Sequence, residues 1–264
     1  PIWRREYLGQ WVTDDTGYVY KFRAHHPETG APWNIWTPGE KTTENPFGLP
    51  EGHRWQYVYG MDLGWSDPYA LQILAFSEDS RNLYQVYEYS KKGMSVREIA
   101  ELVLGMIDIT GYPDGMVADT AGLGGQVLAE LAEVYGLSIE AAEKKNKNDA
   151  IELLNSDLVD GRFKLLGRSM LREEMETLQY DDTGLKENKA QANHCADAAI
   201  YARRRAQHQH AKPPTMPLPL RGTAEYDERK ILEDEERAAK PPDTEWPTGS
   251  DDFSDFLQGG NEFP

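Results

Sequence analysis

Cysteine and long apolar segments are nearly absent from this sequence of 264 residues. The single cysteine, Cys195, excludes a disulfide within the chain and a zinc site built from several cysteines. One unpaired cysteine agrees with a reducing cytoplasm. The longest apolar stretches have the length of a strand, far short of the ~20 residues that a membrane span needs. We therefore expect no membrane partner.

Positive charge is also scarce, which bears on nucleic-acid partners. Lys and Arg number 28 against 45 Asp and Glu, so the net charge is −17. Phosphate binding depends on Lys and Arg, and this balance by itself argues against a nucleic acid. Residues 211–264 hold six Lys/Arg and thirteen Asp/Glu, a net −7, which leaves −10 for the rest. Metal ions on site carboxylates would neutralise part of that remainder.

A phosphate-binding loop of the GxxxxGK[ST] kind is absent as well. The glycine-rich turn at 120–125 reads TAGLGG and lacks the Lys and Ser/Thr that such a loop requires. The sequence therefore predicts no nucleotide-driven motor within these residues.

Composition divides the chain into three zones. Residues 1–56 are rich in Trp, Pro, Gly and Thr, and predict an irregular connector that packs its aromatic side chains on a neighbouring surface. Residues 57–210 predict a compact α/β domain. Residues 211–264 are acidic and Pro-rich, a composition typical of a flexible C-terminal tail.

The middle zone alternates between strand-like and helix-like segments. Three runs at 57–64, 69–76 and 83–89 are separated by turn residues and predict adjacent antiparallel strands. Ser95 followed by Glu98 predicts a capping box that opens a helix. Further strands are expected at 115–119, 137–142 and 163–166, further helices at 122–135, 148–159, 169–178 and 193–208, and a hairpin at 180–190. This order predicts a mixed sheet with helices on both faces.

Three aspartates occupy positions where an unpaired carboxylate is costly. Asp62 lies in the apolar strand 57–64, where metal coordination would offset its burial, or it caps a strand-end turn. Asp119 ends a strand, where ligands bind in open α/β sheets, unless it serves as a helix N-cap. Asp197 begins a mostly buried helix and needs a cation or donors, or it stabilises the positive helix terminus.

Together these elements match a known arrangement. A first strand with an inward Asp, a fourth strand ending in Asp and a closing helix with Asp are typical of the ribonuclease H-like fold. The segments GMDLGW (60–65), VADTAG (117–122) and NHCADAA (193–199) resemble the nuclease domain of the large terminase subunits of tailed phages. The segment REYLG (5–9) resembles the connector to the packaging ATPase. The resemblance covers residues 1–208.

The resemblance implies a metal-dependent endonuclease that cuts double-stranded concatemeric viral DNA during genome packaging. It also implies two Mg²⁺ or Mn²⁺ ions held by Asp62, Asp119 and Asp197. Two metals about 4 Å apart activate a water molecule and stabilise the departing 3′ oxygen. Such hard cations prefer oxygen ligands, which aspartates supply. We expect products with 5′-phosphate and 3′-hydroxyl ends.

Two residues near the aspartates are auxiliary candidates. Asp67 follows Asp62 across a turn and is a candidate fourth ligand, although a turn-forming Asp before Pro68 is the simpler interpretation. His194 lies three residues before Asp197 and therefore shares its helix face. It either orients a ligand or contacts phosphate, or it is an ordinary polar residue at a helix start.

Several basic residues are candidate DNA contacts, each with a simpler alternative. A basic run beside the strand end at 142 either holds the DNA backbone or forms a solvated loop. Lys189, in the hairpin, either touches DNA or shields the site. Arg203–Arg205 predict an exposed helix end. The basic run consists of Lys144, Lys145 and Lys147.

The expected partners follow from the resemblance, and two other functions stay open. We expect double-stranded DNA, a packaging ATPase domain preceding Pro1, a portal and a small terminase subunit, all in the host cell cytoplasm. A resolvase or transposase of the same fold would need a more basic DNA-binding element. A catalytically silent docking module would use its aspartates structurally. Metal binding distinguishes this last alternative from a nuclease.

Overall fold

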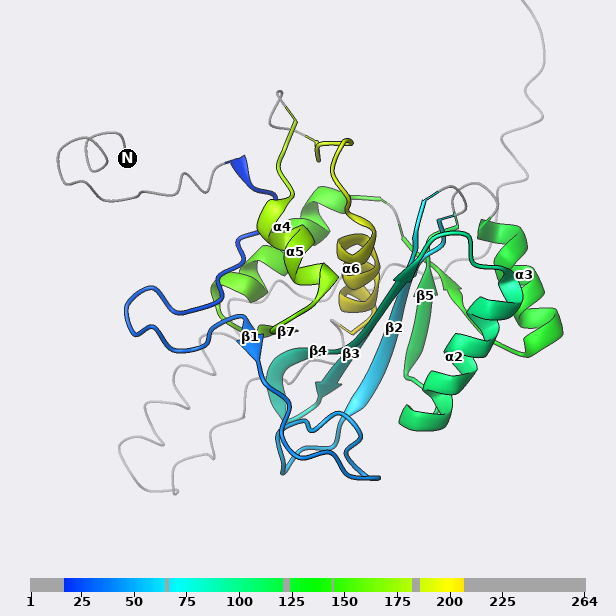
Figure 1. The fold of residues 1–264 in the computed structure, drawn as a ribbon, viewed down its shortest axis with the longest axis horizontal. Coiled ribbons are helices and arrows are strands. Elements are labelled where there is room, and N and C mark those ends of the chain that lie inside the picture. The colour runs from blue at the N-terminus through cyan, green and yellow to red at the C-terminus, as the bar shows by residue number, and fades with distance from the viewer. Residues whose placement is uncertain (1–16, 65–66, 121–123, 144, 182–185, 207–264) are drawn as a thin grey trace, which may run out of the picture. The chain divides into compact units, whose positions relative to one another are not determined.

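A computed structural model describes residues 17–64, 67–120, 124–143, 145–181 and 186–206 (Figure 1). The segment REYLG, Lys144 and the acidic tail from residue 211 lie outside the described residues. Within the described ranges, no helix has both the length and the apolar character needed to cross a membrane.

The centre of the fold is a seven-stranded mixed sheet in the order β1-β7-β4-β3-β2-β5-β6. The strand β3 pairs antiparallel with both β2 and β4, while β5 runs parallel to β2, and β7 parallel to β4. The predicted mixed sheet, with antiparallel strands beside parallel ones and helices on both faces, is confirmed. The strands are β1 (Ile35–Trp36), β2 (Gln56–Asp62), β3 (Tyr69–Ser77), β4 (Ser80–Lys91), β5 (Gly115–Ala118), β6 (Glu140–Ala141) and β7 (Phe163–Leu166).

Helices cover both faces of the sheet (Figure 1). One face carries α2 (Val96–Thr110) and α3 (Gly124–Tyr135), and the other carries α4 (Lys147–Val159), α5 (Met170–Thr177) and α6 (His194–Ala206). The predicted capping box is present, because Ser95 accepts from the backbone N–H of Glu98 while the Glu98 carboxylate accepts from that of Ser95. It satisfies backbone donors that an uncapped helix would leave without partners.

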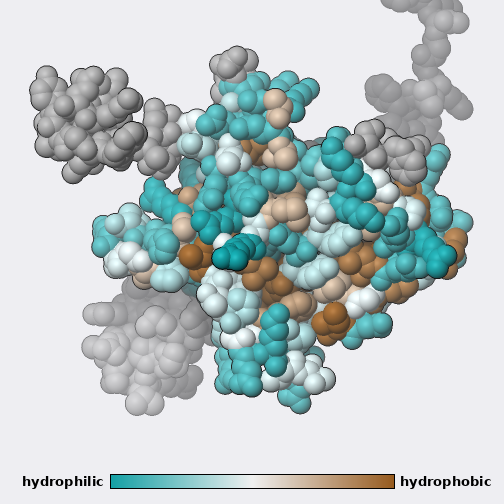
Figure 2. All heavy atoms as spheres, in the orientation of Figure 1, coloured by the Kyte–Doolittle hydropathy of each residue, from teal (hydrophilic) through white to brown (hydrophobic). Residues whose placement is uncertain are grey.

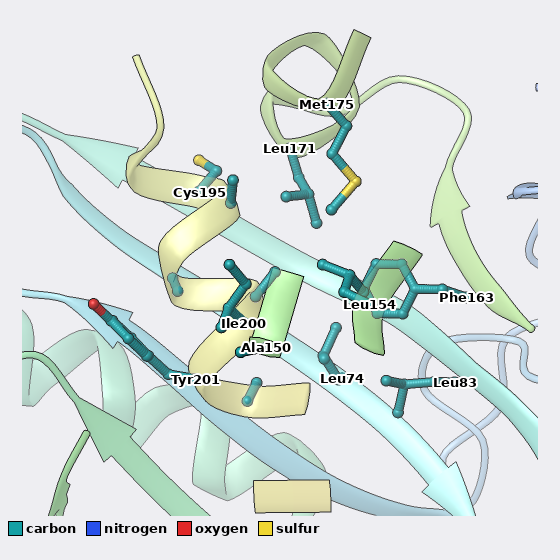
Figure 3. Packing of buried hydrophobic residues seen from close by; sticks show 14 of the residues in the cluster. Leu74, Leu83, Ala150, Leu154, Phe163, Leu171, Met175, Cys195, Ile200 and Tyr201 are labelled. Carbon is teal, nitrogen blue, oxygen red and sulfur yellow. The ribbon is translucent and has the colours of Figure 1, made fainter. Parts of the chain in front are cut away.

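Alternation along the strands divides the apolar side chains between the two faces. In β3, Ala70 and Leu74 face the helices α4, α5 and α6, whereas Leu71 and Ile73 face α2. All nine residues of β3 are buried, because both faces of this central strand are covered. Figure 3 shows the apolar cluster on the face that carries α4, α5 and α6, with buried side chains packed against α6. The view in Figure 2 shows a mainly hydrophilic surface with scattered hydrophobic side chains.

The described part of the predicted connector, residues 17–56, is built into this same compact unit. Trp36 of this segment packs edge-on against Tyr84, and the segment also adds β1 to the sheet beside β7. Val19 and Tyr20 are buried in the cluster around α6. A buried amide helps to hold this segment in place, since Asn34 donates to the carbonyls of Leu158 and Phe163, at 2.8 and 3.2 Å.

Candidate active site

The parallel pairing of β2 with β5 brings Asp62 and Asp119 to the same end of the sheet. Met61 lies opposite Ala118 in the register, and the backbone N–H of Asp119 donates to the carbonyl of Met61 at 3.0 Å. Asp62 is the last residue of β2 and Asp119 directly follows β5, so both lie at the carboxyl ends of neighbouring parallel strands. This is the position where open α/β sheets bind ligands.

A glycine lets α6 approach β2 closely enough to bring the third aspartate to this end. A Cβ at Gly60 would overlap the carbonyl oxygen of Ala198, so the helix backbone rests directly on the strand. Gly60 and Asp62 are two residues apart and share a sheet face. Asp197, one residue before Ala198, thus lies over the end of β2.

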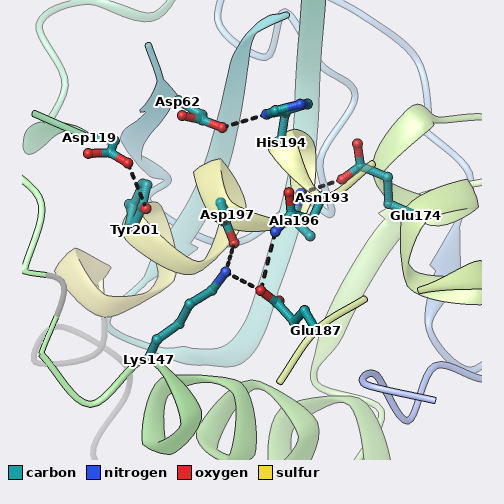
Figure 4. Close-up of polar contacts among 10 residues, drawn as sticks. All are labelled: Asp62, Asp119, Lys147, Glu174, Glu187, Asn193, His194, Ala196, Asp197 and Tyr201. Atoms are coloured by element: carbon teal, nitrogen blue, oxygen red, sulfur yellow. Dashed lines mark hydrogen bonds and ion pairs between the residues drawn. The ribbon is translucent and has the colours of Figure 1, made fainter. Parts of the chain in front are cut away.

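Each of the three aspartates has a different polar neighbour (Figure 4). Asp62 Oδ2 lies 2.9 Å from Nδ1 of His194, and the Tyr201 hydroxyl donates to Asp119 Oδ2 at 3.5 Å. Asp197 Oδ1 lies 2.6 Å from the ammonium of Lys147. Two of these neighbours, His194 and Tyr201, belong to α6, so this helix supplies three side chains of the cluster.

Lys147 lies between two carboxylates from different parts of the chain. Besides Asp197, its ammonium contacts Oε2 of Glu187, which also accepts from the Asn193 amide at 3.2 Å. Burial disfavours the charge on Lys147, but Asp197 and Glu187 outweigh it and raise the lysine pKa. The basic run thus splits, because Lys147 turns inward while Lys145 is exposed.

Electrostatic coupling shows that the three aspartates share one environment. Burial raises the pKa of Asp197 to about 7; Lys147 opposes this shift, while Glu187 and, more weakly, Asp62 add to it. Burial raises the pKa of Tyr201 well above its usual range, and the charges of all three aspartates raise it further. One ammonium shared by two buried carboxylates leaves excess negative charge, which a proton or another cation would relieve.

The start of α6 is anchored by a carboxylate that sequence patterns did not single out. Glu174, on α5, accepts a hydrogen bond from the backbone N–H of Ala196 at 2.8 Å. Burial raises the pKa of Glu174, while hydrogen bonds from Ala196 and Cys195 act in the opposite direction. The carboxylate satisfies first-turn donors of α6 and thereby positions His194 and Asp197.

A groove of about 460 Å³ opens beside this cluster. Its lining includes Asp67, Lys147, Lys186, Lys189 and His194. Asp67 is exposed on the wall of the groove, and Lys189 is exposed on the segment that follows Glu187. The groove therefore places amino groups that suit a phosphate backbone beside Lys147 and His194, which contact Asp197 and Asp62.

The arginines at the end of α6 differ from the expected exposed helix end. Arg203 is only 8% exposed and pairs with Asp157 at 2.8 Å. Arg204 donates to the backbone carbonyl of Glu143 at 2.8 Å, and Arg205 lies 3.3 Å from Asp114. The prediction was wrong because helical position alone does not show that α4 and the loops around α6 surround this end. These arginines tie α6 to its neighbours.

The carboxylate oxygens of this cluster suit a hard divalent cation as ligands. Their side chains are not yet arranged as a coordination site. The cluster offers oxygen donors, and a positive group, the Lys147 ammonium, already lies against Asp197. Among the described residues, no group of three or more His, Cys, Asp or Glu side chains is spaced to hold a metal ion. A bound metal would thus require side-chain rearrangement at this cluster.

Three residues of the cluster were not predicted from the sequence: Glu174, Glu187 and Tyr201. Glu187 lies in a polar segment and Glu174 on an ordinary amphipathic helix, so neither has an unusual local context. Tyr201 carried one usable signal, because it follows Asp197 by four residues and therefore shares its helix face.

The fold defines a class of protein: α/β domains with a mixed sheet and with carboxylates at the ends of two neighbouring parallel strands. No family model and no curated protein matches the sequence. Solved structures do match. The large terminase of the thermophilic bacteriophage D6E aligns with a TM-score of 0.53 and 19% identity, over 71% of this chain and 44% of that one. The P22 large terminase nuclease domain aligns with a TM-score of 0.52 and 19% identity, over 72% of this chain and 94% of that one.

These similarities confirm the predicted resemblance in fold. The chain matches nearly the whole P22 nuclease domain but less than half the length of the D6E large terminase. The terminase nuclease domain is thus a known fold to which this chain is similar.

Proposed function

We propose that this chain is a metal-dependent endonuclease that cuts double-stranded concatemeric viral DNA during genome packaging. The observation that carries the proposal is the convergence of Asp62, Asp119 and Asp197, from β2, the end of β5 and α6, beside a lysine-lined groove. The fold that this chain shares with the P22 large terminase nuclease domain supports the same function.

The three aspartates would hold two Mg²⁺ or Mn²⁺ ions, with Asp67 as a candidate further ligand. When bound, these ions would supply an activated water molecule and neutralise the departing 3′ oxygen. His194 orients Asp62 through their 2.9 Å contact, and Tyr201 steadies Asp119. Lys186 and Lys189, on the groove wall, would bind phosphates and align the strand.

The partners in this proposal are double-stranded DNA and a packaging ATPase domain that supplies much of the DNA grip. The chain's net charge of −17 makes weak binding by the nuclease alone the physical expectation. A portal and a small terminase subunit are the proposed partners of residues 211–264, and the host cell cytoplasm is the proposed location.

Plasmid cleavage by wild type and by Asp119→Asn, each with Mn²⁺, Mg²⁺ or EDTA, tests the proposal. Asparagine keeps the shape of the side chain but removes the charge that binds metal. We expect metal-dependent nicking and linearisation by wild type, and a loss of about a hundredfold or more in the variant. Asp108→Asn, on the exposed side of α2, removes the same charge away from the cluster and should cleave like wild type.

A catalytically silent docking module is the second candidate, and one observation favours it. Among the described residues, no set of three or more His, Cys, Asp or Glu side chains is already spaced to hold a metal ion. If wild type neither cuts DNA nor gains thermal stability with Mn²⁺ or Mg²⁺, the nuclease proposal is wrong and the docking module replaces it.

A further inference from the structure

Lys147 occupies an unusual place for a lysine beside a cluster of carboxylates. It is the first residue of α4, and its ammonium lies against Asp197 and Glu187 (Figure 4). The side chains of these two acids are only 16% and 15% exposed, and that of Lys147 is 31% exposed. The ion pair is therefore largely withdrawn from water. In such a buried environment a charge without a counterion is costly.

A left-handed turn precedes Lys147 at the start of α4. Asn146 adopts a left-handed conformation with φ 57° and ψ 45°, which asparagine tolerates better than most residues. Its side chain makes no capping hydrogen bond to α4. Lys147 directly follows this turn, and its ammonium lies against the carboxylates of Asp197 and Glu187.

One ammonium cannot balance the whole cluster. Lys147 faces two acids directly, and Asp62 adds to the negative field at Asp197. A divalent cation binding at Asp197 Oδ1 would need the position against which the ammonium lies at 2.6 Å. Lysine and metal therefore compete for the same oxygen.

We propose that Lys147 is a built-in counterion of this site, which holds Asp197 while no metal is bound and withdraws when a divalent cation binds there. The inference rests on the proposed function, because it assumes that Asp197 is a metal ligand. Lys147 is thus a positioning residue that sets metal affinity, and it does not touch the reacting atoms in this state. Because Lys147 also lines the groove, its withdrawn ammonium would face the phosphate backbone of a bound strand.

Competition predicts that removing the ammonium strengthens metal binding. We would measure Mn²⁺ affinity by calorimetry, and the Mn²⁺-induced rise in Tm, for wild type and for Lys147→Met, which keeps the apolar stem. We expect Mn²⁺ to bind about tenfold more tightly to the variant, within the usual range of coupling between two bound groups. Without metal, the variant should melt below wild type, since Asp197 and Glu187 lose their counterion.

Two further variants keep the test decisive. Lys147→Gln is also neutral, and its amide has N–H donors for the carboxylates. It replaces Lys147→Met if that variant fails to fold, and it should likewise bind Mn²⁺ more tightly than wild type. Lys189→Met removes a charge from the same groove without removing the counterion of Asp197, and its Mn²⁺ affinity should stay within about twofold of wild type. Adding Asp197→Asn to Lys147→Met should abolish the gain.

The outcomes separate the two proposals. If wild type binds Mn²⁺ and both Lys147 variants bind it equally or more weakly, the counterion role is wrong while the nuclease proposal stands. If the Lys147 variants bind Mn²⁺ and wild type does not, the counterion role is supported in its strongest form. If none of these proteins binds Mn²⁺, both proposals fail.

Discussion

At the scale of single residues, Asp197 shows how burial changes the chemistry of a carboxyl group. Its pKa is raised from the ordinary 3.8 to about 7, chiefly because burial disfavours the ionised form. The ammonium of Lys147 lowers the pKa of Asp197, but the same ammonium also pairs with Glu187. The folded protein therefore binds a proton at Asp197 over a pH range in which the unfolded chain has already released it.

This shift predicts a pH dependence of stability. Between about pH 4 and pH 7 the folded state holds the proton of Asp197 and the unfolded state does not, so its contribution to stability falls as pH rises. We expect the free energy of unfolding of wild type, relative to Asp197→Asn, to be lower at pH 7.5 than at pH 5. Urea unfolding in EDTA at both pH values measures this difference. A difference that is constant with pH would contradict the raised pKa.

At the scale of elements, the helix α6 assembles most of the cluster. It supplies His194, Asp197 and Tyr201, and its first turn is held by the carboxylate of Glu174. Its place on the sheet depends on Gly60, where the carbonyl oxygen of Ala198 fills the space that a side chain would need. One glycine in β2 therefore determines how closely Asp197 approaches the strand ends.

Gly60→Ala should push α6 away from the sheet. The added methyl group meets backbone rather than a flexible side chain, so we expect a loss of about 3 kcal/mol or more in the free energy of unfolding. Mn²⁺ binding should weaken as well, since Asp197 moves with the helix. Gly105→Ala is the matched control, because the new methyl group on α2 meets open space and should stabilise by about 0.5–1 kcal/mol. Urea unfolding measures the free energy of unfolding of both variants. Equal values for Gly60→Ala and Gly105→Ala would contradict the close packing of α6 on Gly60.

At the scale of the whole domain, two buried asparagines join the N-terminal segment to the helical layer. Asn34 is fully buried and bonds to the carbonyls of Leu158 and Phe163, while its own oxygen accepts from Arg23. Asn155, on α4, accepts from the backbone of Lys21 and donates to that of Val19, both at 2.9 Å. These long-range bonds make residues 17–36 a structural part of the domain.

Asn34→Ala and Asn155→Ala should therefore destabilise the whole domain. Each substitution leaves buried backbone groups without partners, which we expect to cost about 2–3 kcal/mol in the free energy of unfolding. Asn148→Ala, at an exposed position of α4, should change stability by less than about 0.5 kcal/mol. Chemical denaturation of the three variants tests this, and a loss of stability no larger than that of the exposed control would contradict the structural role.

The sequence by itself predicted the local elements and singled out three aspartates as candidate site residues. The capping box at Ser95 and the strand at 163–166 coincide with observed elements because their signals lie within a few neighbouring residues. Asp62 and Asp119 were recognisable because a carboxylate in or after an apolar strand is costly without a partner. The mixed sheet followed from the order of strands and helices.

Only the tertiary structure decided which distant side chains meet. Lys147, Glu187 and Asp197 come together from α4, a polar segment and α6, and nothing in the residues beside Glu187 indicates this contact. The burial of Arg203 and the addition of β1 beside β7 likewise depend on contacts more than 40 residues apart in the chain. Periodicity shows which face of an element is apolar, but packing determines which other element covers it, and so which charges share a site.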